Sequence, residues 1–482
     1  MTERRKLWIL VLCCIGQFMV ILDVSVVNVA LPAIRSGLHF RPADLQWVVN
    51  AYTLTFAGFL LLGGRACDLL VRRNVFIFGM GLFALASLVG GLAQSQGMLI
   101  VARGIQGLGG AVVAPATLSI ITATFTDGHE RNRALGAWGA MGAAGGSVGV
   151  LLGGLLTQFL SWRWILFINV PIGAVTTLAA LRVIGAEKPE APSRRDFDLA
   201  GAISGTLGLI VLTFGIVKTD QYGWGSARTL ITLAIGVALL AIFIVIEARF
   251  AKAPLMPLGV FRSRQLSGAN IVVMMLGASA FTVWYFASLY LQEVHSFTPV
   301  ETGAAFLPPA VVLAAASQIA GKRLVHVGAG RLLVLGMTLI AIGLIWMGQA
   351  NTTGTYWSEI FVPFMIVGAG IGITFVSVTV AGMAGVEPRQ LGIASGLINT
   401  SRQVGASLGL AILATTATAR TADLLGHTSV HSALTSGFDR AFVLGGIFAA
   451  VGAVASAILI PFKRPPARAR AEAPVPESAA GA

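Results

Sequence analysis

One acidic residue interrupts an apolar stretch near the start of the chain. Asp23 lies in FMVILDVSVVNVALP, residues 18–32, where most of the neighbouring side chains are aliphatic. An ionised carboxylate is costly in apolar surroundings, so a residue of this kind is a candidate functional group by default. Burial favours its protonated form, and a nearby arginine favours its ionised form. A site in which that balance shifts can bind a proton on one side of a barrier and release it on the other.

Two arginines, Arg103 and Arg402, also lie inside apolar stretches. If successive spans run in opposite directions, Asp23 and Arg103 both lie roughly 6–9 Å below the same membrane surface, at ~1.5 Å of rise per residue. This similar depth permits a charge pair. Structural roles remain open as well: a cap or hydrogen bonds within the bundle for Asp23, and a tie to backbone carbonyls for Arg103. Arg402 lies about seven residues from the cytosolic end of its span, so snorkelling or packing between helices is as good an interpretation as function.

The composition shows which medium surrounds these charges. The chain has 482 residues, of which 56% are hydrophobic and only 11% charged, and its mean hydropathy is +0.83. Apolar stretches of about twenty residues, the length that crosses a bilayer, recur along the whole sequence. We expect fourteen membrane-spanning helices, over residues 7–29, 45–63, 75–93, 98–121, 133–156, 164–184, 199–217, 229–247, 268–291, 302–320, 331–349, 357–381, 395–417 and 439–462. The sequence therefore predicts an all-α polytopic membrane protein without a sizeable soluble domain.

The distribution of lysine and arginine predicts the orientation. With a cytosolic N-terminus, 24 of the 33 basic residues fall in cytosolic segments, 7 fall in external segments, and 2, Arg103 and Arg402, lie inside spans. Both termini are therefore expected to be cytosolic, in the cytoplasmic (inner) membrane of a bacterium. The net charge of +13 then lies mostly in loops beside anionic lipid headgroups, which argues against a nucleic-acid partner.

Several function classes find no support in the residues. The three cysteines, Cys13, Cys14 and Cys67, do not suggest a disulfide framework, and the six histidines form no metal-binding cluster. The glycine-rich GIQGLGGAV, residues 104–112, lies in an apolar span with no strand before it, so it is not a dinucleotide loop. No Gly-x-x-x-x-Gly-Lys-Ser/Thr loop indicates ATP as a fuel. We expect that the protein is not an enzyme, needs no cofactor and uses a proton gradient as its source of energy.

The order of the spans suggests two six-helix bundles with an inserted helix pair. We expect a first bundle over residues 1–184, cytosolic linkers and two inserted helices over 185–267, a second bundle over 268–462, and a disordered cytosolic tail over 463–482. A weak internal repeat supports a duplication, because GGRACDLLVRRNVF and GKRLVHVGAGRLL occupy matching loops. Two parallel repeats with a site between them are typical of one large class of secondary transporters.

Five motifs in order give the chain a specific resemblance from about residue 8 to residue 462. They read LDVSVVNVALPAI in the first span, LQWVVNAYTLTFAGFLLLGGRACDLLVRRNVF in the second span and its following loop, ARGIQGLGGAVVAPATL in the fourth, SWRWILFINVPIG at the sixth and LGIASGLINTSRQVGASLG in the thirteenth. The chain thereby resembles the major facilitator superfamily and, within it, the fourteen-span drug:proton antiporters of the EmrB/QacA type. This resemblance implies the major facilitator fold, two six-helix bundles plus two inserted helices, and transport by alternating access.

The resemblance also implies roles for particular residues. It places Asp23 and Arg103 beside the central cavity as the proton-coupling pair. Four residues after the second span form a cytosolic gate, for which a solvated loop is the alternative: Gly64, Asp68, Arg72 and Arg73. A helix-packing antiporter motif lies in the fifth span: Gly145, Gly149, Gly153 and Gly154. The chain departs from the family pattern at Val71, where glycine is usual, and at Val150, where the usual proline would kink the helix.

The cargo is less well indicated by the sequence. Candidates for lining a cargo cavity share an amphipathic or polar side chain: Asn28, Tyr52, Gln106, Trp138, Tyr290 and Gln292. For the aromatic members, packing against lipid or at the membrane surface is an equally good interpretation. Apart from Asp23, the spans offer almost no acidic residue near mid-depth. Such a cavity favours amphiphilic small molecules over multiply charged cations.

These observations together favour proton-coupled efflux of amphiphilic drugs or antibiotics across the bilayer, as in multidrug or antibiotic resistance. The same fold and residues would suit a proton-coupled exporter or importer of a physiological metabolite, which differs in cargo and direction. A non-transporting membrane sensor is a third interpretation. The presence of Asp23, Arg103 and the gate loop in one chain disfavours it.

Overall fold

The computed structural model describes residues 2–125, 128–185, 198–251, 254–256, 258–349, 355–383 and 391–462, and nearly all of them form helices. The first helices are α1 (Glu3–Leu38), α2 (Pro42–Leu45), α3 (Trp47–Leu69), α4 (Arg72–Gly91), α5 (Gln96–Thr124), α6 (Gly128–Phe159), α7 (Trp164–Phe167) and α8 (Asn169–Val183). The middle of the chain forms α9 (Leu199–Val217), α10 (Thr219–Tyr222), α11 (Ala227–Val245), η2 (Ile246–Phe250) and η3 (Leu258–Arg262). The last helices are α12 (Arg264–Glu293), α13 (Pro299–Ala305), α14 (Leu307–Val327), α15 (Ala329–Met347), η4 (Tyr356–Phe361), α16 (Val362–Met383), α17 (Leu391–Leu424) and α18 (Val430–Leu459).

The expected all-α membrane fold is confirmed. Among the described residues, thirteen helical segments are long and apolar enough to cross a bilayer. The fourteenth expected span, 395–417, lies within α17, which has 34 residues but carries several polar side chains in its first half. The observed helices therefore agree closely with the fourteen expected spans.

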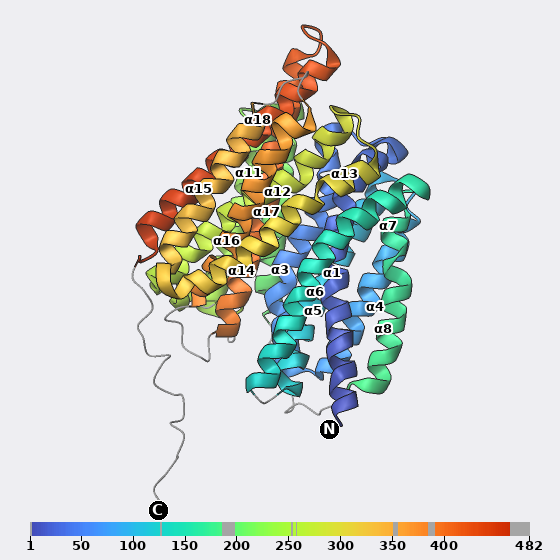
Figure 1. The fold of residues 1–482 in the computed structure, drawn as a ribbon, viewed down its shortest axis with the longest axis vertical. Helices are drawn as coiled ribbons and strands as arrows, with labels where there is room; N and C mark the ends of the chain where they lie inside the picture. The colour runs from blue at the N-terminus through green and yellow to red at the C-terminus, as the bar shows by residue number, and fades with distance from the viewer. Residues whose placement is uncertain are drawn as a thin grey trace, which may run out of the picture.

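The helices gather into two groups and an inserted pair (Figure 1). In the first group α1 packs against α6, α5 and α8, while α5 also packs against α3 and α4. In the second group α12 packs against α17, α18 and α16, while α16 also packs against α14 and α15. Helices α9 and α11 pack mainly on each other, and α9 also reaches α3 and α17. The exact domain boundaries stay a prediction, and the expected tail over 463–482 lies outside the described residues.

Several contacts between the two groups lie toward one end of the molecule, the end at which α1 stops at Leu38. We call this the distal end; the sequence predicts that it faces the outside. There α1 contacts α12, and α6 contacts α13 and α14. Helices α3 and α17 lie together along much of their length, with Ser407 donating a hydrogen bond to Asn50 at 3.0 Å. These contacts form the interface across which the two groups would have to move.

Glycines on α6 allow α1 to approach closely. A β-carbon placed on Gly145 would lie 2.9 Å from the backbone oxygen of Phe18, and one on Gly153 would lie 2.7 Å from that of Val26. Both distances are below ordinary contact, so neither site accepts a side chain without moving backbone. Helix α6 runs without interruption through Val150, the position at which the family usually has proline.

The fourth glycine of the expected motif lies at a different interface. A β-carbon on Gly154 would collide with the backbone oxygen of Pro299 in α13, in the other helix group. Conversely, a β-carbon on Gly303 of α13 would lie 2.8 Å from the backbone oxygen of Val150. Small residues thus bring α6 close to α1 on one side and to the second group on the other, as in other membrane helix interfaces.

Gly149 provides a stability test of this packing. A β-carbon there would lie 2.9 Å from Cβ of Ser25 and 3.0 Å from the backbone oxygen of Leu22. We expect Gly149→Ala to lower the free energy of unfolding by about 1–3 kcal/mol, because overpacking must displace α1. Gly139 on the same helix has nothing within 4 Å of such an atom. Gly139→Ala should therefore be neutral or raise stability by up to ~1 kcal/mol through helix propensity. Thermal unfolding in detergent compares them, and equal midpoints would contradict this account.

Candidate functional site

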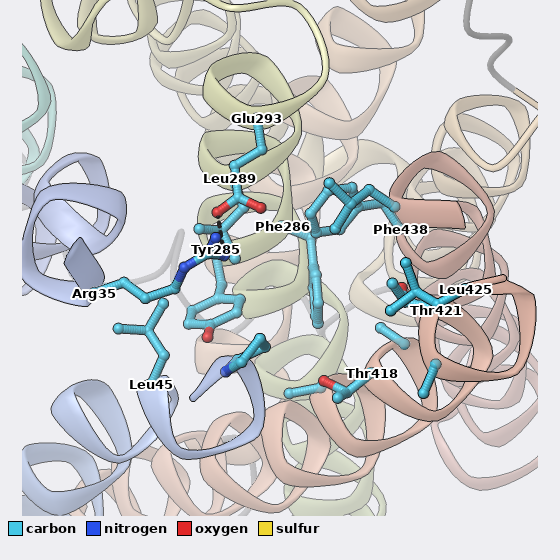
Figure 2. Close-up of a pocket in the computed structure, with 15 residues that line it drawn as sticks. Arg35, Leu45, Tyr285, Phe286, Leu289, Glu293, Thr418, Thr421, Leu425 and Phe438 are labelled. Atoms are coloured by element: carbon cyan, nitrogen blue, oxygen red, sulfur yellow. Dashed lines mark hydrogen bonds and ion pairs between the residues drawn. The ribbon is translucent and has the colours of Figure 1, made fainter. Parts of the chain in front are cut away.

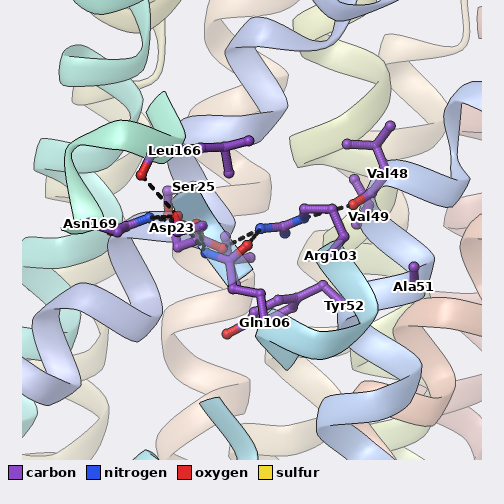
Figure 3. Close-up of polar contacts among 12 residues, drawn as sticks. Asp23, Ser25, Val48, Val49, Ala51, Tyr52, Arg103, Gln106, Leu166 and Asn169 are labelled. Atoms are coloured by element: carbon purple, nitrogen blue, oxygen red, sulfur yellow. Dashed lines mark hydrogen bonds and ion pairs between the residues drawn. The ribbon is translucent and has the colours of Figure 1, made fainter. Parts of the chain in front are cut away.

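The carboxylate of Asp23 is enclosed by hydrogen-bond donors from two other helices (Figure 3). Asp23 has no exposed surface. Its Oδ2 accepts from Nη1 of Arg103 at 2.5 Å, and its Oδ1 accepts from Nε2 of Gln106 at 2.7 Å and from Nδ2 of Asn169 at 2.9 Å. The structure thus brings together Asp23 and Arg103 as a buried ion pair, at the similar depth that their positions in the sequence indicate.

Arg103 is held in place by more than the carboxylate. Its Nε donates to the backbone oxygen of Val48 at 3.0 Å, and its Nη1 also donates to Oε1 of Gln106 at 2.7 Å. The guanidinium carbon lies 4.6 Å from the centre of the Tyr52 ring, which adds a cation–π contact. Arg103 is only 2% exposed. Helices α1, α3 and α5 are therefore tied together at this one guanidinium.

A serine completes the second layer of the cluster. The Ser87 hydroxyl on α4 donates to the backbone oxygen of Leu166 at 2.8 Å and accepts from both Gln106 and Asn169 at 3.1 Å. The sequence does not predict that Ser87 and Asn169 join this cluster. Asn169 lies in the SWRWILFINVPIG motif, which is a signal for it, whereas Ser87 is one hydroxyl in an apolar helix and gives no signal.

The cluster satisfies both oxygens of the Asp23 carboxylate. They accept from three donors, one of which is the charged guanidinium of Arg103. A movement that separates α1 from α5 and α8 would therefore deprive the carboxylate of these partners.

Two of the candidates for the cargo cavity belong to this cluster instead, namely Tyr52 and Gln106. Asn28 and Gln292 lie where α1 meets α12: the backbone oxygen of Asn28 accepts from the Ser288 hydroxyl at 2.9 Å, and Gln292 donates to the backbone oxygen of Val29 at 3.0 Å.

The remaining aromatic candidates lie apart from that junction. Trp138 donates to the Thr117 hydroxyl at 3.0 Å. Tyr290 has no exposed surface, and its ring packs on Phe438 and Phe442. The structure therefore does not gather the six candidates into one cavity.

The expected cytosolic gate lies at the turn between α3 and α4. α3 ends at Leu69, one residue after Asp68, whose side chain is outside the described part of the structure. α4 begins at Arg72, and Nε of Arg73 lies 3.4 Å from Oδ1 of Asn74. The nearest neighbour of a β-carbon on Gly64 would be Pro115 at 3.9 Å. The gating role of these residues stays a prediction.

A second ion pair joins the two helix groups at the distal end. Nη1 of Arg35 on α1 lies 2.7 Å from Oε1 of Glu293 on α12, and both residues line a cavity of about 140 Å³ (Figure 2). Aromatic and hydroxyl side chains from α12, α17 and α18 line the rest of it, among them Tyr285, Thr418 and Phe438. The sequence does not indicate this pair, because 258 residues separate Arg35 from Glu293.

Comparison with known proteins supports a transport role for this architecture. The family model described as Major Facilitator Superfamily matches residues 13–410. The chain is 40% identical over 470 residues to a cephamycin export protein of Amycolatopsis lactamdurans, covering 96% of this chain and 93% of that protein. It is 35% identical over 461 residues to a puromycin resistance protein of Streptomyces alboniger, covering 95% and 91% of the two chains.

The fold is also shared with solved transporter structures. One is the crystal structure of a bacterial homologue of the human lysosomal transporter Spinster, which has a TM-score of 0.68 and 16% sequence identity, with 95% of this chain and 97% of that chain covered. Such low identity shows the fold alone. The family match and the two relatives indicate a transporter and not an enzyme. The chain belongs to the major facilitator superfamily of membrane transporters.

Proposed function

We propose that the chain exports amphiphilic antibiotics or drugs across a bacterial cytoplasmic membrane in exchange for protons, as a fourteen-span drug:proton antiporter of the EmrB/QacA type. The relatives that support this proposal are described as export or resistance proteins for cephamycin and puromycin. The proton gradient would be the source of energy, and no cofactor is needed. The N-terminus would lie in the cytosol, so the distal end would face outside.

The single observation that carries the proposal is the burial of Asp23. Of the acidic residues that the structure describes, only Asp23 has no exposed surface. A charge at this depth costs ~2.5–3.5 kcal/mol on insertion scales, so it is retained only with a partner and a role. Arg103 supplies the partner. The role consistent with a carboxylate whose pairing can be broken is reversible proton binding.

The structure also suggests how proton binding would be linked to the opening of the transporter. In the arrangement observed, Asp23 is ion-paired, and the distal side is held together by contacts of α1 with α12 and of α6 with α13. Opening of the distal side would require α1 and α6 to move relative to the second group. Because α1 also carries Asp23, such a movement would loosen its donors and admit a proton from outside. Rocking of two halves about a central site is the usual mode of this class of transporters.

The energy available is sufficient for one such carboxylate. A membrane potential of ~100 mV supplies ~2.3 kcal/mol for each charge that crosses. This corresponds to a concentration ratio of roughly fifty for an electroneutral cargo, since 1.4 kcal/mol is a factor of ten. One proton for each cargo molecule would therefore maintain a useful gradient.

The first test of the proposal is proton flux in proteoliposomes with an imposed pH gradient and a panel of amphiphilic antibiotics. We expect drug-dependent proton movement with the native chain. Asp23→Asn should abolish it, because the amide fills the same volume and keeps neutral hydrogen bonds but cannot exchange a proton.

Asp44→Asn is the matched control. Asp44 is an acidic residue at the distal surface, and its carboxylate pairs with Arg41 and Lys218 instead of with the Asp23 cluster. Its variant should retain coupled flux. Equal flux in the Asp23→Asn and native proteins would remove Asp23 from the mechanism, provided that thermal unfolding shows both to be folded.

The Arg35–Glu293 pair provides a test of distal opening. We expect Glu293→Gln to favour the distally open state by about 1 kcal/mol, or roughly fivefold in population, because a partly buried ion pair between the groups is lost. The measurement is the rate at which a membrane-impermeant thiol reagent labels Thr418→Cys, with Cys13, Cys14 and Cys67 replaced by serine. Thr418 lines the distal cavity.

Arg41→Gln is the control for this experiment. It breaks the distal ion pair between Arg41 and Asp44, which are three residues apart in the same helix group. It should leave the labelling rate unchanged, and the exchange Arg35→Glu with Glu293→Arg should restore the slow rate. A labelling rate that does not respond to Glu293→Gln would show that the ion pair does not hold the distal side closed.

A further inference from the structure

Arg402 on α17 is the second arginine inside an apolar stretch, and it lacks the partners that Arg103 has. A guanidinium offers five N–H donors. The structure gives Arg402 one long hydrogen bond, from Nη2 to Oδ1 of Asn399 at 3.4 Å, and a ring contact with Phe375, whose centre lies 5.9 Å from the guanidinium carbon. Among the residues described, no carboxylate pairs with it. Most of its donors therefore remain available to a ligand.

The helices that pack around Arg402 hold no acidic side chain at its depth. α16 contains no Asp or Glu, and α12 and α17 each contain one at the distal end, Glu293 and Asp423. At ~1.5 Å of rise per residue, Asp423 lies about 31 Å along the helix from Arg402. Among the described residues of these three helices, no carboxylate therefore lies at the depth of Arg402.

The backbone that carries Arg402 is fixed against α12. A β-carbon on Gly277 would collide with the backbone oxygen of Arg402, so the two helices touch backbone to backbone at this level. The adjacent Ser401 donates to Oδ1 of Asn270 at 2.7 Å. The Arg402 side chain extends toward Phe375 on α16, which is 48% exposed.

We propose that Arg402 and Phe375 form an anion-binding subsite for the cargo, which would be an amphiphile with one carboxylate, sulfonate or phosphate group beside an apolar ring system. The planar guanidinium fork suits an oxyanion, and the exposed aromatic ring suits the apolar part. This inference rests on the proposed export function and narrows its cargo. The phosphate of an anionic lipid has the same chemistry, but Arg402 lies about 10 Å along α17 from residue 395, where the expected span begins, which is deeper than a headgroup lies.

Two probes with one ring frame test the subsite. 1-Anilinonaphthalene-8-sulfonate carries a sulfonate, and N-phenyl-1-naphthylamine is the same frame without it. Their fluorescence is titrated against the protein in phosphatidylcholine nanodiscs, with empty discs subtracted. We expect Arg402→Gln to weaken binding of the sulfonate probe about tenfold and to change binding of the neutral probe less than about twofold, because only the charge-assisted bonds are lost. Arg402→Lys, which keeps the charge but not the fork, should lose about threefold.

The matched control is Arg420→Gln. It removes the same charge from the same helix, at an exposed position whose side chain bonds to Ser436. It should leave both affinities unchanged. An equal response of the two probes to Arg402→Gln, or no response, would overturn the proposal. If thermal unfolding shows that the Arg402→Gln protein is not folded, Arg402→Lys is compared with Arg420→Gln in its place.

Two further arms separate the possible sources of the anion and the two proposals. If a lipid headgroup occupies Arg402, replacing part of the phosphatidylcholine by phosphatidylglycerol will lower sulfonate binding of the native protein to the level of Arg402→Gln, and the assignment to cargo fails. Probe binding needs no proton gradient. If the native protein binds the sulfonate probe selectively but Asp23→Asn leaves proton flux unchanged, antiport is refuted and the subsite is retained. If sulfonate selectivity is absent but Asp23→Asn abolishes proton flux, the subsite is refuted and antiport is retained.

Discussion

The cost of placing one carboxylate in an apolar medium determines how the first helix group is built. Asp23 is fully buried, and its two oxygens accept from Arg103, Gln106 and Asn169. The same cluster includes Val48 and Tyr52, which contact Arg103, and Ser87, which accepts a hydrogen bond from Gln106. Breaking a buried pair by removing one partner typically costs ~3–5 kcal/mol. Five helices, α1, α3, α4, α5 and α8, therefore converge at one point for electrostatic reasons as well as for packing.

The packing behind α1 connects this cluster to the rest of the molecule. Gly145 and Gly153 of α6 allow close contact with α1 on either side of Asp23 in the sequence, and Gly154 of the same helix touches Pro299 of the second group. A shift of α1 that separates Asp23 from Arg103 must therefore displace α6 or slide along it. This chain of contacts supplies a physical route by which protonation and distal opening would be coupled.

The sequence predicts those features that depend on hydropathy and on counting residues along a helix. The apolar stretches predict the helices, and the depths of Asp23 and Arg103 indicate their pairing. The partners Ser87 and Asn169 are not predicted, because a hydroxyl or amide in a membrane helix can also bond to its own backbone, and only the fold brings residues 87 and 169 together. The pair of Arg35 and Glu293 is not predicted either, because 258 residues separate them and only the fold brings them together. α17 extends past the expected 395–417 because good helix formers continue after the apolar stretch ends.

The two arginines inside spans differ in a way that bears on function. Arg103 is saturated by partners within its own helix group, whereas Arg402 has one long hydrogen bond and an exposed aromatic neighbour. Both bear the cost of a charge within a span, so the unsatisfied one gains most from an external anion. The two charged sites lie in opposite helix groups. Arg103 can release the carboxylate of Asp23, and Arg402 can bind the anionic group of a ligand. Since alternating access moves these groups relative to one another, a proton at the first site and an anionic cargo at the second would respond to the same movement without direct contact.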